Sequence, residues 1–269
     1  MLRKLMKHEF RATGRVLLPL LGILLLAALA ARFSLGFLLE TDSWFLNLVG
    51  GLLTAAFGLA IFAVCLMALI TMVNRFRTNL LGDEGYIMFT LPASVHQQIW
   101  SKLIVSAVWF IATGLAVVAA SFILVAQQGF WQDIRWGIRQ MFQGLTAYYA
   151  FNGTAFLLEL LGLIFVACCA LCLEFYAAMA IGHSFNDHKG LLSVVSFFVL
   201  SAAMTMLAVV SASITGNSGL FDLVGNIDTL DISAATHVVM LIFIAIEMVK
   251  AALYYIPTTL CLKKWLNLA

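Results

Sequence analysis

Four ionisable residues lie inside long apolar stretches of this sequence, where a charged side chain is expensive. They are Glu159, Glu174, Glu247 and Lys250. An ionisable group near the middle of a bilayer costs about 2.5–3.5 kcal/mol on insertion scales, so each of the four is a candidate functional group. Glu247 and Lys250 are three residues apart and would share one helix face, where an ion pair lowers this cost and allows a purely structural role. A proton relay needs acids at one depth, whereas these four are spread along their segments.

Residue patterns typical of other chemistry are absent or weak. The sequence has no GxSxG, no HExxH and no GxxxxGK[ST] loop that could cradle a phosphate. One CxxC is present, at Cys169 and Cys172, but a structural zinc site needs four ligands, so we expect inert thiols. His183 and His188 flank Asp187 in a short polar stretch, which holds too few donors for a metal, and we predict solvent-exposed histidines. We therefore expect neither an enzyme nor a chain that binds a cofactor.

The composition places these residues in a membrane protein. Of the 269 residues, 63% are hydrophobic and 10% are charged, against about 45–50% and 25% in soluble domains. So few charges could not cover the surface of a soluble globule, which excludes a soluble enzyme, a disordered chain and a disulfide-rich secreted scaffold. The net charge of +2 gives no indication of nucleic-acid binding.

Six apolar runs are each long enough to cross a bilayer, which needs about 20 residues per helix. They cover residues 16–39, 45–73, 103–127, 154–182, 191–213 and 235–260. With only three prolines and long continuous runs, helices are favoured over the alternating strands of a membrane barrel. The sequence therefore predicts an all-α membrane protein with one transmembrane domain over residues 1–269. A cleaved signal peptide is the weaker alternative, because apolar residues resume at 35–39.

Lys and Arg are distributed unequally between the two sides of the predicted bundle. If the N-terminus is cytoplasmic, the outer segments hold Arg32, Arg135 and Arg139, and Lys250 lies within the last span. All other Lys and Arg residues then flank the inner ends of the spans. This bias follows the positive-inside rule and predicts a multi-pass protein of the plasma membrane with both termini in the cytoplasm.

Two segments outside these spans have amphipathic helical patterns. Residues 1–15 combine an apolar face with many cations, and we expect an interfacial helix among the lipid headgroups, although a simple basic topology signal would look the same. On the other side of the membrane, residues 128–150 predict a helix that lies on the outer leaflet or re-enters it. Its apolar stripe consists of Ile134, Ile138, Met141, Phe142 and Leu145.

The longest predicted cytoplasmic segment, residues 74–102, carries the signals of two helices. Gly82 is a flexible break, and Asp83 can cap a short helix over Glu84–Thr90. Pro92 disfavours helical backbone at the residue before it and ends this element. Ser94 then fits a capping box that starts a helix running into the third span.

The short helix is unusually apolar for a cytoplasmic loop. It contains Tyr86, Ile87, Met88 and Phe89, and Leu91 follows it. Aromatic side chains beside an acidic first turn are typical of a surface that docks another protein. The alternative is that these side chains pack on the ends of the spans or on lipid headgroups.

Residues 79–92, with their Gly-Asp-Glu-Gly-Tyr stretch, resemble the first cytoplasmic loop of the six-span permease subunits of ABC-2-type ATP-binding-cassette exporters. This family is common in Gram-positive bacteria. The basic start at 1–10, the predicted loop at 181–189 and the basic end at 262–268 are similar to the corresponding parts of that family. The resemblance covers the whole chain in order and topology, and residues 82–86 are its most specific part.

The resemblance implies a coupling helix in the first cytoplasmic loop that docks into a separate ATPase subunit. The residues concerned are Gly82, Asp83, Glu84, Gly85, Tyr86, Phe89 and Leu91. It also implies a pair of permease subunits, identical or different, in a bacterial cytoplasmic membrane, with ATP and Mg bound by the ATPase and a peptide, antibiotic or lipid-like cargo. Two other functions stay open: a stand-alone proton-coupled transporter that uses the intramembrane Glu and Lys residues, and a non-transporting immunity or assembly factor.

Overall fold

The computed structural model describes residues 2–38, 43–82, 84–85, 90, 93–125, 130–149, 152–185, 187–217 and 232–265. Its elements are α1 (Leu2–Phe33), η1 (Ser34–Leu38), α2 (Trp44–Phe76), η2 (Arg77–Leu81), α4 (Val95–Val125), α5 (Phe130–Tyr149), α6 (Gly153–Gly182), α7 (Lys189–Asn217), α9 (Ile232–Leu260) and η4 (Cys261–Trp265). No strand occurs among these residues. The predicted all-α fold is confirmed.

Six helices of the described residues are long and apolar enough to cross a membrane. They cover Leu2–Phe37, Trp44–Leu81, Val95–Val125, Gly153–Gly182, Lys189–Val210 and Thr236–Lys263. These segments contain the six predicted runs with small differences at their ends. Long apolar sequences become helices in lipid because every backbone N–H and C=O must find its partner within the segment.

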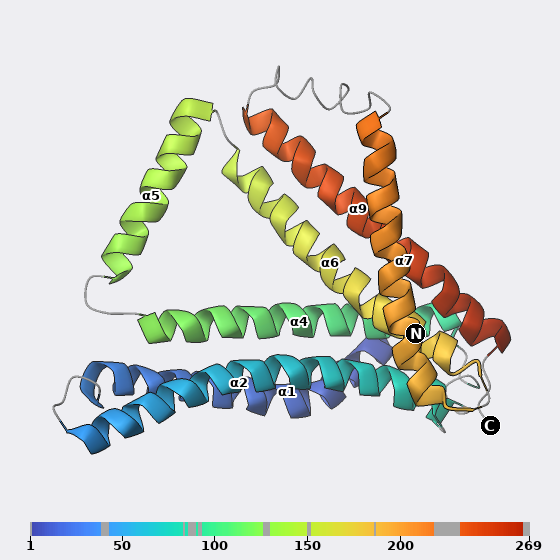
Figure 1. The fold of residues 1–269 in the computed structure, drawn as a ribbon, viewed down its shortest axis with the longest axis horizontal. Coiled ribbons are helices and arrows are strands. Elements are labelled where there is room, and N and C mark those ends of the chain that lie inside the picture. The colour runs from blue at the N-terminus through green and yellow to red at the C-terminus, as the bar shows by residue number, and fades with distance from the viewer. Residues whose placement is uncertain are drawn as a thin grey trace.

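The six long helices form two groups of three, which join at one end and diverge at the other to give a V (Figure 1). Helices α1, α2 and α4 pack together as one half, and α6 packs against α7 and α9 as the other. The contact between the halves is mainly that of α4 with α6. We call the end that holds η2, the start of α4 and η4 the joined end. The opposite end, which holds η1 and the start of α6, is the open end.

Tyr176 of α6 connects the two halves at the joined end. Its ring stacks on Phe76 of α2, with centroids 3.9 Å apart. Its hydroxyl is 2.8 Å from that of Ser106 on α4, and the side chain is almost fully buried. The surrounding apolar cluster draws residues from α2, η2, α4, α6, α9 and η4. This end is therefore the packed core of the molecule.

Helix α5 crosses the mouth of the V, from near the tip of α4 to near the tip of α6 (Figure 1). The helix predicted within residues 128–150 is confirmed at Phe130–Tyr149. Helix α5 thus runs from one arm of the V to the other instead of along either arm. A helix that lies along a membrane surface would have such a direction.

The N-terminal segment differs from its predicted form. Residues 2–15 are not a separate interfacial helix but the first turns of α1, which continues without a break to Phe33. Met6 and Phe10 pack against the cluster that contains Trp109 of α4, and the rings of Phe10 and Trp109 are 6.4 Å apart. Met6 and Phe10, two residues of the predicted apolar face, therefore contact protein.

Candidate functional site

The candidate docking segment begins where the backbone leaves η2. Gly82 has extended backbone, with φ −101° and ψ −167°, and its carbonyl accepts a hydrogen bond of 2.8 Å from the Gly85 amide. Glu84 and Gly85 are helical, and the Glu84 side chain is exposed. Asp83, Tyr86, Phe89 and Leu91 lie outside the described residues, so the short helix over 84–90 remains a prediction.

Both ends of this segment are fixed in the core at the joined end. Leu80 and Leu81 precede it and are buried, and Ile99 in the first turns of α4 is buried in the same cluster. Helix α4 begins where the sequence predicts, because the Ser94 hydroxyl accepts from the Gln97 amide at 3.3 Å. A displacement of residues 82–94 would therefore act directly on the region that connects both halves.

A buried polar cluster lies close to this segment, and sequence reasoning missed it. The Glu9 carboxylate of α1 is 2.5 Å from the Lys102 ammonium of α4 and 3.5 Å from Arg75 Nε of α2. The Asn79 amide of η2 donates a further hydrogen bond of 3.1 Å to it. Only 8% of the Glu9 side chain and 3% of the Lys102 side chain are exposed. One acid therefore ties three helices together in an apolar environment.

Sequence reasoning places Lys102 among the cations that flank the inner ends of the spans and assigns no role to Glu9. The structure buries both side chains. Glu9 is the lone acid in residues 1–15. Glu9 is thus a single carboxylate among several cations on an amphipathic segment. This pattern was the available signal that Glu9 needs a partner inside the protein.

The predicted pairing of Glu247 with Lys250 is confirmed, with Lys250 Nζ 2.6 Å from Glu247 Oε1. Glu174, the third acid singled out from the sequence, has partners on α7 and α9. Tyr254 donates to the Glu174 carboxylate, Ser201 hydrogen-bonds to it, and Lys250 interacts with it electrostatically. Three of the four ionisable residues singled out from the sequence therefore gather between α6, α7 and α9.

The fourth, Glu159, lies nearer the open end and has a partner that sequence reasoning did not identify. Its Oε2 accepts from His237 Nδ1 of α9 at 2.8 Å. Both side chains are largely buried, with 18% of Glu159 and 22% of His237 exposed. The packing of α6 on α9 thus contains two polar layers, at Glu159 and at Glu174.

The loop histidines differ from each other. His188 is exposed as predicted, but His183 is buried against the end of α6, and its Nδ1 donates to the Met179 carbonyl at 2.9 Å. Burial lowers the pKa of His183, and the positive charges of Arg77 and Lys189 lower it further. Within the described residues, no three His, Cys, Asp or Glu side chains come together as a metal site.

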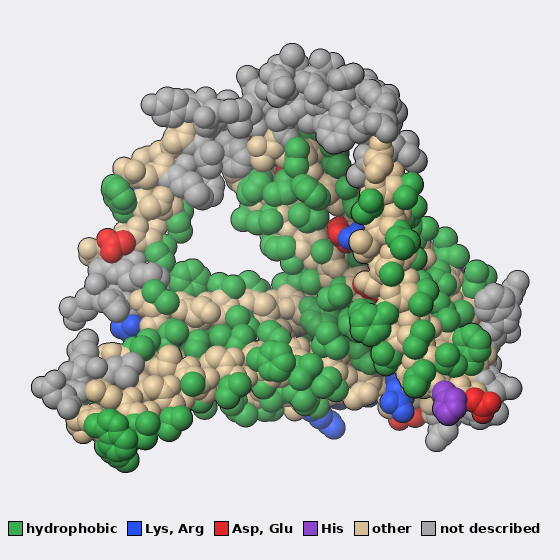
Figure 2. Space-filling model, in the orientation of Figure 1, with side chains coloured by type: hydrophobic (Ala, Val, Ile, Leu, Met, Phe, Trp, Pro, Cys, Tyr) green, Lys and Arg blue, Asp and Glu red, His purple; other side chains and the backbone are tan. Residues whose placement is uncertain are grey.

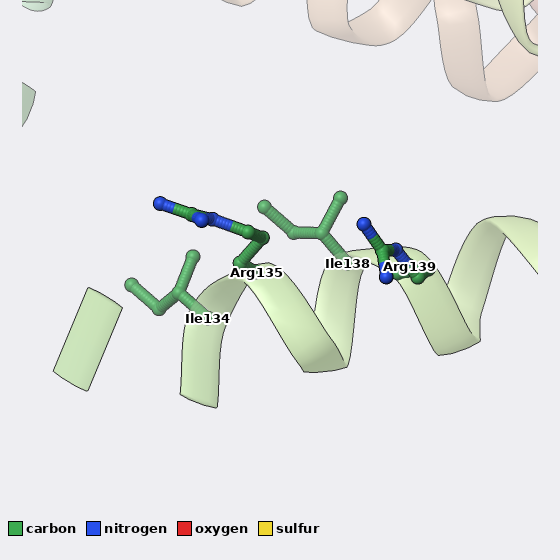
Figure 3. Close-up of a pocket in the computed structure, with 4 residues that line it drawn as sticks. All are labelled: Ile134, Arg135, Ile138 and Arg139. Atoms are coloured by element: carbon green, nitrogen blue, oxygen red, sulfur yellow. The ribbon is translucent and has the colours of Figure 1, made fainter. Parts of the chain in front are cut away.

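Helix α5 carries a surface hollow of about 360 Å³ lined by four of its own residues. Ile134, Arg135, Ile138 and Arg139 lie along one side of the helix (Figure 3). Because a single exposed helix lines this hollow, it does not enclose a ligand. Its four lining residues show that the exposed face of α5 combines apolar and basic side chains.

Comparison with known proteins gives no match for this chain among protein-family models, curated proteins or solved structures.

Proposed function

We propose that this chain is the membrane-spanning subunit of an ATP-driven exporter in a bacterial cytoplasmic membrane. Its joined end faces the cytoplasm, and a separate cassette ATPase docks there on residues 82–91. A second permease subunit, identical or different, completes the translocation path, and the cargo is a peptide, an antibiotic or a lipid-like molecule. ATP and Mg bind to the ATPase subunit.

The observation that carries this proposal is the anchoring of the candidate docking segment. Its two ends enter an apolar cluster that contains residues of both halves of the V. Packed cores switch between discrete arrangements rather than deforming gradually, so a rigid push on this segment would change the angle between the halves. This is the mechanical property that a coupling helix needs.

The charge of the segment also suits a protein partner. Glu84 is exposed and lies near enough to Lys102 for an electrostatic interaction. Carboxylates in such a position can form charge-assisted hydrogen bonds with Arg or Lys on the partner. The apolar side chains that the sequence places after it would supply the buried contact of the interface.

The outer surfaces of the two halves suit a lipid environment. Hydrophobic side chains are spread over both groups of helices on the face seen in Figure 2, and few charged side chains lie among them. Large apolar residues such as Phe62, Leu115, Phe198 and Met206 are more than half exposed. A soluble protein rarely exposes so much apolar surface, so lipid or a second permease subunit covers these faces.

The test is co-expression of this chain with a cassette ATPase encoded beside it, followed by purification in detergent. We expect the two chains to co-elute with ATPase activity. Glu84→Arg, and separately the pair Tyr86→Ala and Phe89→Ala, should lower the yield of the complex about tenfold or more, because truncation of an interface hot spot costs about 2 kcal/mol or more. Asp187→Arg is the matched control, since Asp187 is exposed on the neighbouring loop.

The proposal fails if the well-folded chain associates with no cassette ATPase, or if the Glu84 and Tyr86/Phe89 variants associate as the unaltered chain does. Association without cargo flux in vesicles would instead support the non-transporting assembly or immunity factor.

A proton-coupled transporter is the second candidate, favoured by the gathering of Glu174, Glu247 and Lys250 around Tyr254. Such a protein would move cargo in proteoliposomes under a proton gradient without ATP. Glu174→Gln should then abolish this flux, because a proton carrier must change its protonation state. Flux that requires ATP and the partner chain, and that survives Glu174→Gln, would exclude this candidate.

A further inference from the structure

A groove lies between α4 and α9 at the half of the molecule nearer the joined end, with α6 as its floor. Its volume is about 320 Å³. Its lining is apolar and comes from Trp100, Leu103, Phe165, Val166, Cys169, Leu173, Met248, Ala251, Ala252 and Tyr255. Leu103, Cys169 and Leu173 are buried, whereas Trp100 is 45% and Met248 58% exposed. The groove is therefore a slot whose floor is buried at Cys169 and Leu173 and whose rim is exposed.

The length of the groove suits a single hydrocarbon chain. Its floor on α6 extends from Leu173 to Phe165, which corresponds to about 12 Å at 1.5 Å per residue. The hydrocarbon region of one leaflet is about 15 Å thick, half of the 30 Å core. A lipid in the leaflet on the side of the joined end could therefore lay one acyl chain along this slot.

Three polar side chains that the structure describes stand at the end of the groove nearest the joined end. Tyr255 Oη is 2.5 Å from His96 Nδ1, and Lys263 Nζ is 2.9 Å from His96 Nε2. The indole of Trp100 also hydrogen-bonds to the Tyr255 hydroxyl. Since a lysine ammonium only donates, Nε2 accepts and Nδ1 carries the proton, which it donates to Tyr255. The chain of donors fixes the orientation of Lys263 at the mouth of the slot.

The charge at this mouth is positive. Lys263 is exposed. In the ion pairs formed within the described part of the chain, Glu9 pairs with Arg75 and Lys102, Glu159 with His237, and Glu247 with Lys250. None of these carboxylates pairs with Lys263. A cation beside aromatic side chains, at the end of an apolar slot, complements an anionic headgroup joined to an acyl chain.

We propose that this groove binds one anionic phospholipid from the surrounding leaflet. One acyl chain occupies the slot between α4 and α9, and the headgroup phosphate pairs with the Lys263 ammonium, whose position His96 fixes. The site is independent of the proposed docking of an ATPase, because none of its residues belongs to residues 82–91.

The test uses Trp100 as a reporter in the full-length chain. The other five tryptophans, Trp44, Trp109, Trp131, Trp136 and Trp265, are replaced by Phe. The protein is reconstituted in phosphatidylcholine vesicles that contain increasing fractions of phosphatidylglycerol with brominated acyl chains. Bromine quenches indole fluorescence only at short range. We expect quenching that saturates, with a preference for phosphatidylglycerol over brominated phosphatidylcholine of roughly fivefold, the value for one cation at a lipid surface.

Substitutions at two positions test the headgroup contact and the acyl-chain contact separately. Lys263→Gln should reduce the preference for phosphatidylglycerol over phosphatidylcholine to a ratio of about one, while both brominated lipids still quench Trp100. Ala252→Phe, or the smaller Ala252→Leu, fills the slot and should reduce quenching by phosphatidylglycerol at least twofold. The matched controls should change neither quantity: Arg77→Gln removes an exposed cation of the other half, and Ala245→Phe adds the same ring at an exposed position of α9 outside the groove.

The proposal would be overturned if quenching rose linearly with the mole fraction of brominated lipid and were equal for the two lipids. Such quenching would come from the unselective shell of lipids that surrounds any membrane protein. The same conclusion follows if Lys263→Gln leaves the preference intact or if both Ala252 variants leave quenching unchanged. Unaltered helical circular dichroism and elution volume establish that each variant is folded.

Discussion

Glu9 illustrates how one residue can hold three membrane helices in place. Its carboxylate accepts from Lys102 and Asn79 and lies 3.5 Å from Arg75. Removing two opposite charges from water is expensive, and the attraction between them compensates only when the geometry is good and the remaining oxygen lone pairs are satisfied. Glu9 Oε1 accepts two hydrogen bonds, whereas Oε2 lies 3.5 Å from Arg75 Nε, a buried group without a hydrogen-bond partner among the described residues. The second condition is met only in part, so the cluster specifies the arrangement of α1, α2 and α4 more than it adds stability.

This view predicts an asymmetry between single and double substitutions. Lys102→Met leaves the Glu9 carboxylate buried without its closest cation. This change should lower the free energy of unfolding by up to about 3–5 kcal/mol. The loss is smaller to the extent that Arg75 and Asn79 still stabilise the carboxylate. Combining Lys102→Met with Glu9→Gln removes the uncompensated charge and should recover much of the loss. The measurement is unfolding in mixed detergent and dodecyl sulfate, with Lys7→Met as control, because Lys7 is an exposed cation of α1, the helix that carries Glu9. Equal stability of the single and double variants would contradict this account.

At the scale of elements, helices α6 and α7 approach each other closely at the corner between them. A Cβ added to Gly182 would lie 2.6 Å from Ser193 Cα and would also strike the Ser193 amide and hydroxyl. The connection between the two helices includes His188 in the left-handed region, at φ 53°. The close approach of the α6 end to the first turns of α7 thus requires a residue without a side chain at 182.

Gly182→Ala should therefore destabilise the packing of α6 on α7. Backbone atoms on both sides must shift, and overpacking of this kind costs about 1–3 kcal/mol. Gly190→Ala is the matched control, because a Cβ there meets nothing within 4 Å and a helical alanine is favoured over glycine by about 1 kcal/mol. Unfolding midpoints in detergent measure both. If Gly182→Ala were as stable as Gly190→Ala, the contact with Ser193 would not be as close as described.

At the scale of the whole molecule, the V has one packed end and one open end. The start of α1, η2, the loop at 183–188 and η4 share the joined end, whereas α5 crosses the open end (Figure 1). The cations of the joined end, such as Arg75, Arg77, Lys189 and Lys263, follow the distribution expected on a cytoplasmic side. The orientation proposed above follows from this charge distribution.

Labelling of single cysteines tests that orientation. In a variant without the five native cysteines, Gln140→Cys on α5 should react with a membrane-impermeant maleimide in intact cells, because it is exposed at the open end. Asp187→Cys, exposed in the loop between α6 and α7, should react only after permeabilisation. The reverse pattern would place the docking segment outside the cell and would rule out a cytoplasmic ATPase as its partner.

The sequence by itself determined the properties that depend on neighbours along the chain. Apolar runs longer than about 20 residues predicted the six spans, helical spacing predicted α5, and Ser94 predicted the start of α4. The spacing of Glu247 and Lys250 predicted their ion pair. The candidate docking segment was likewise identified from local signals, the Gly82 break and the apolar residues after it, while the function attributed to it remains a proposal.

Only the tertiary structure decided which helices pack together and which polar groups meet. Glu9 and Lys102 are 93 positions apart, Glu159 and His237 are 78 apart, and the groove between α4 and α9 draws on three separate helices. The physical reason is that lipid tails and protein interiors are equally apolar. A membrane helix therefore does not show in its hydrophobic pattern which face meets protein. The arrangement is decided by close packing and by pairing of the few polar side chains, and both depend on residues far apart in the sequence.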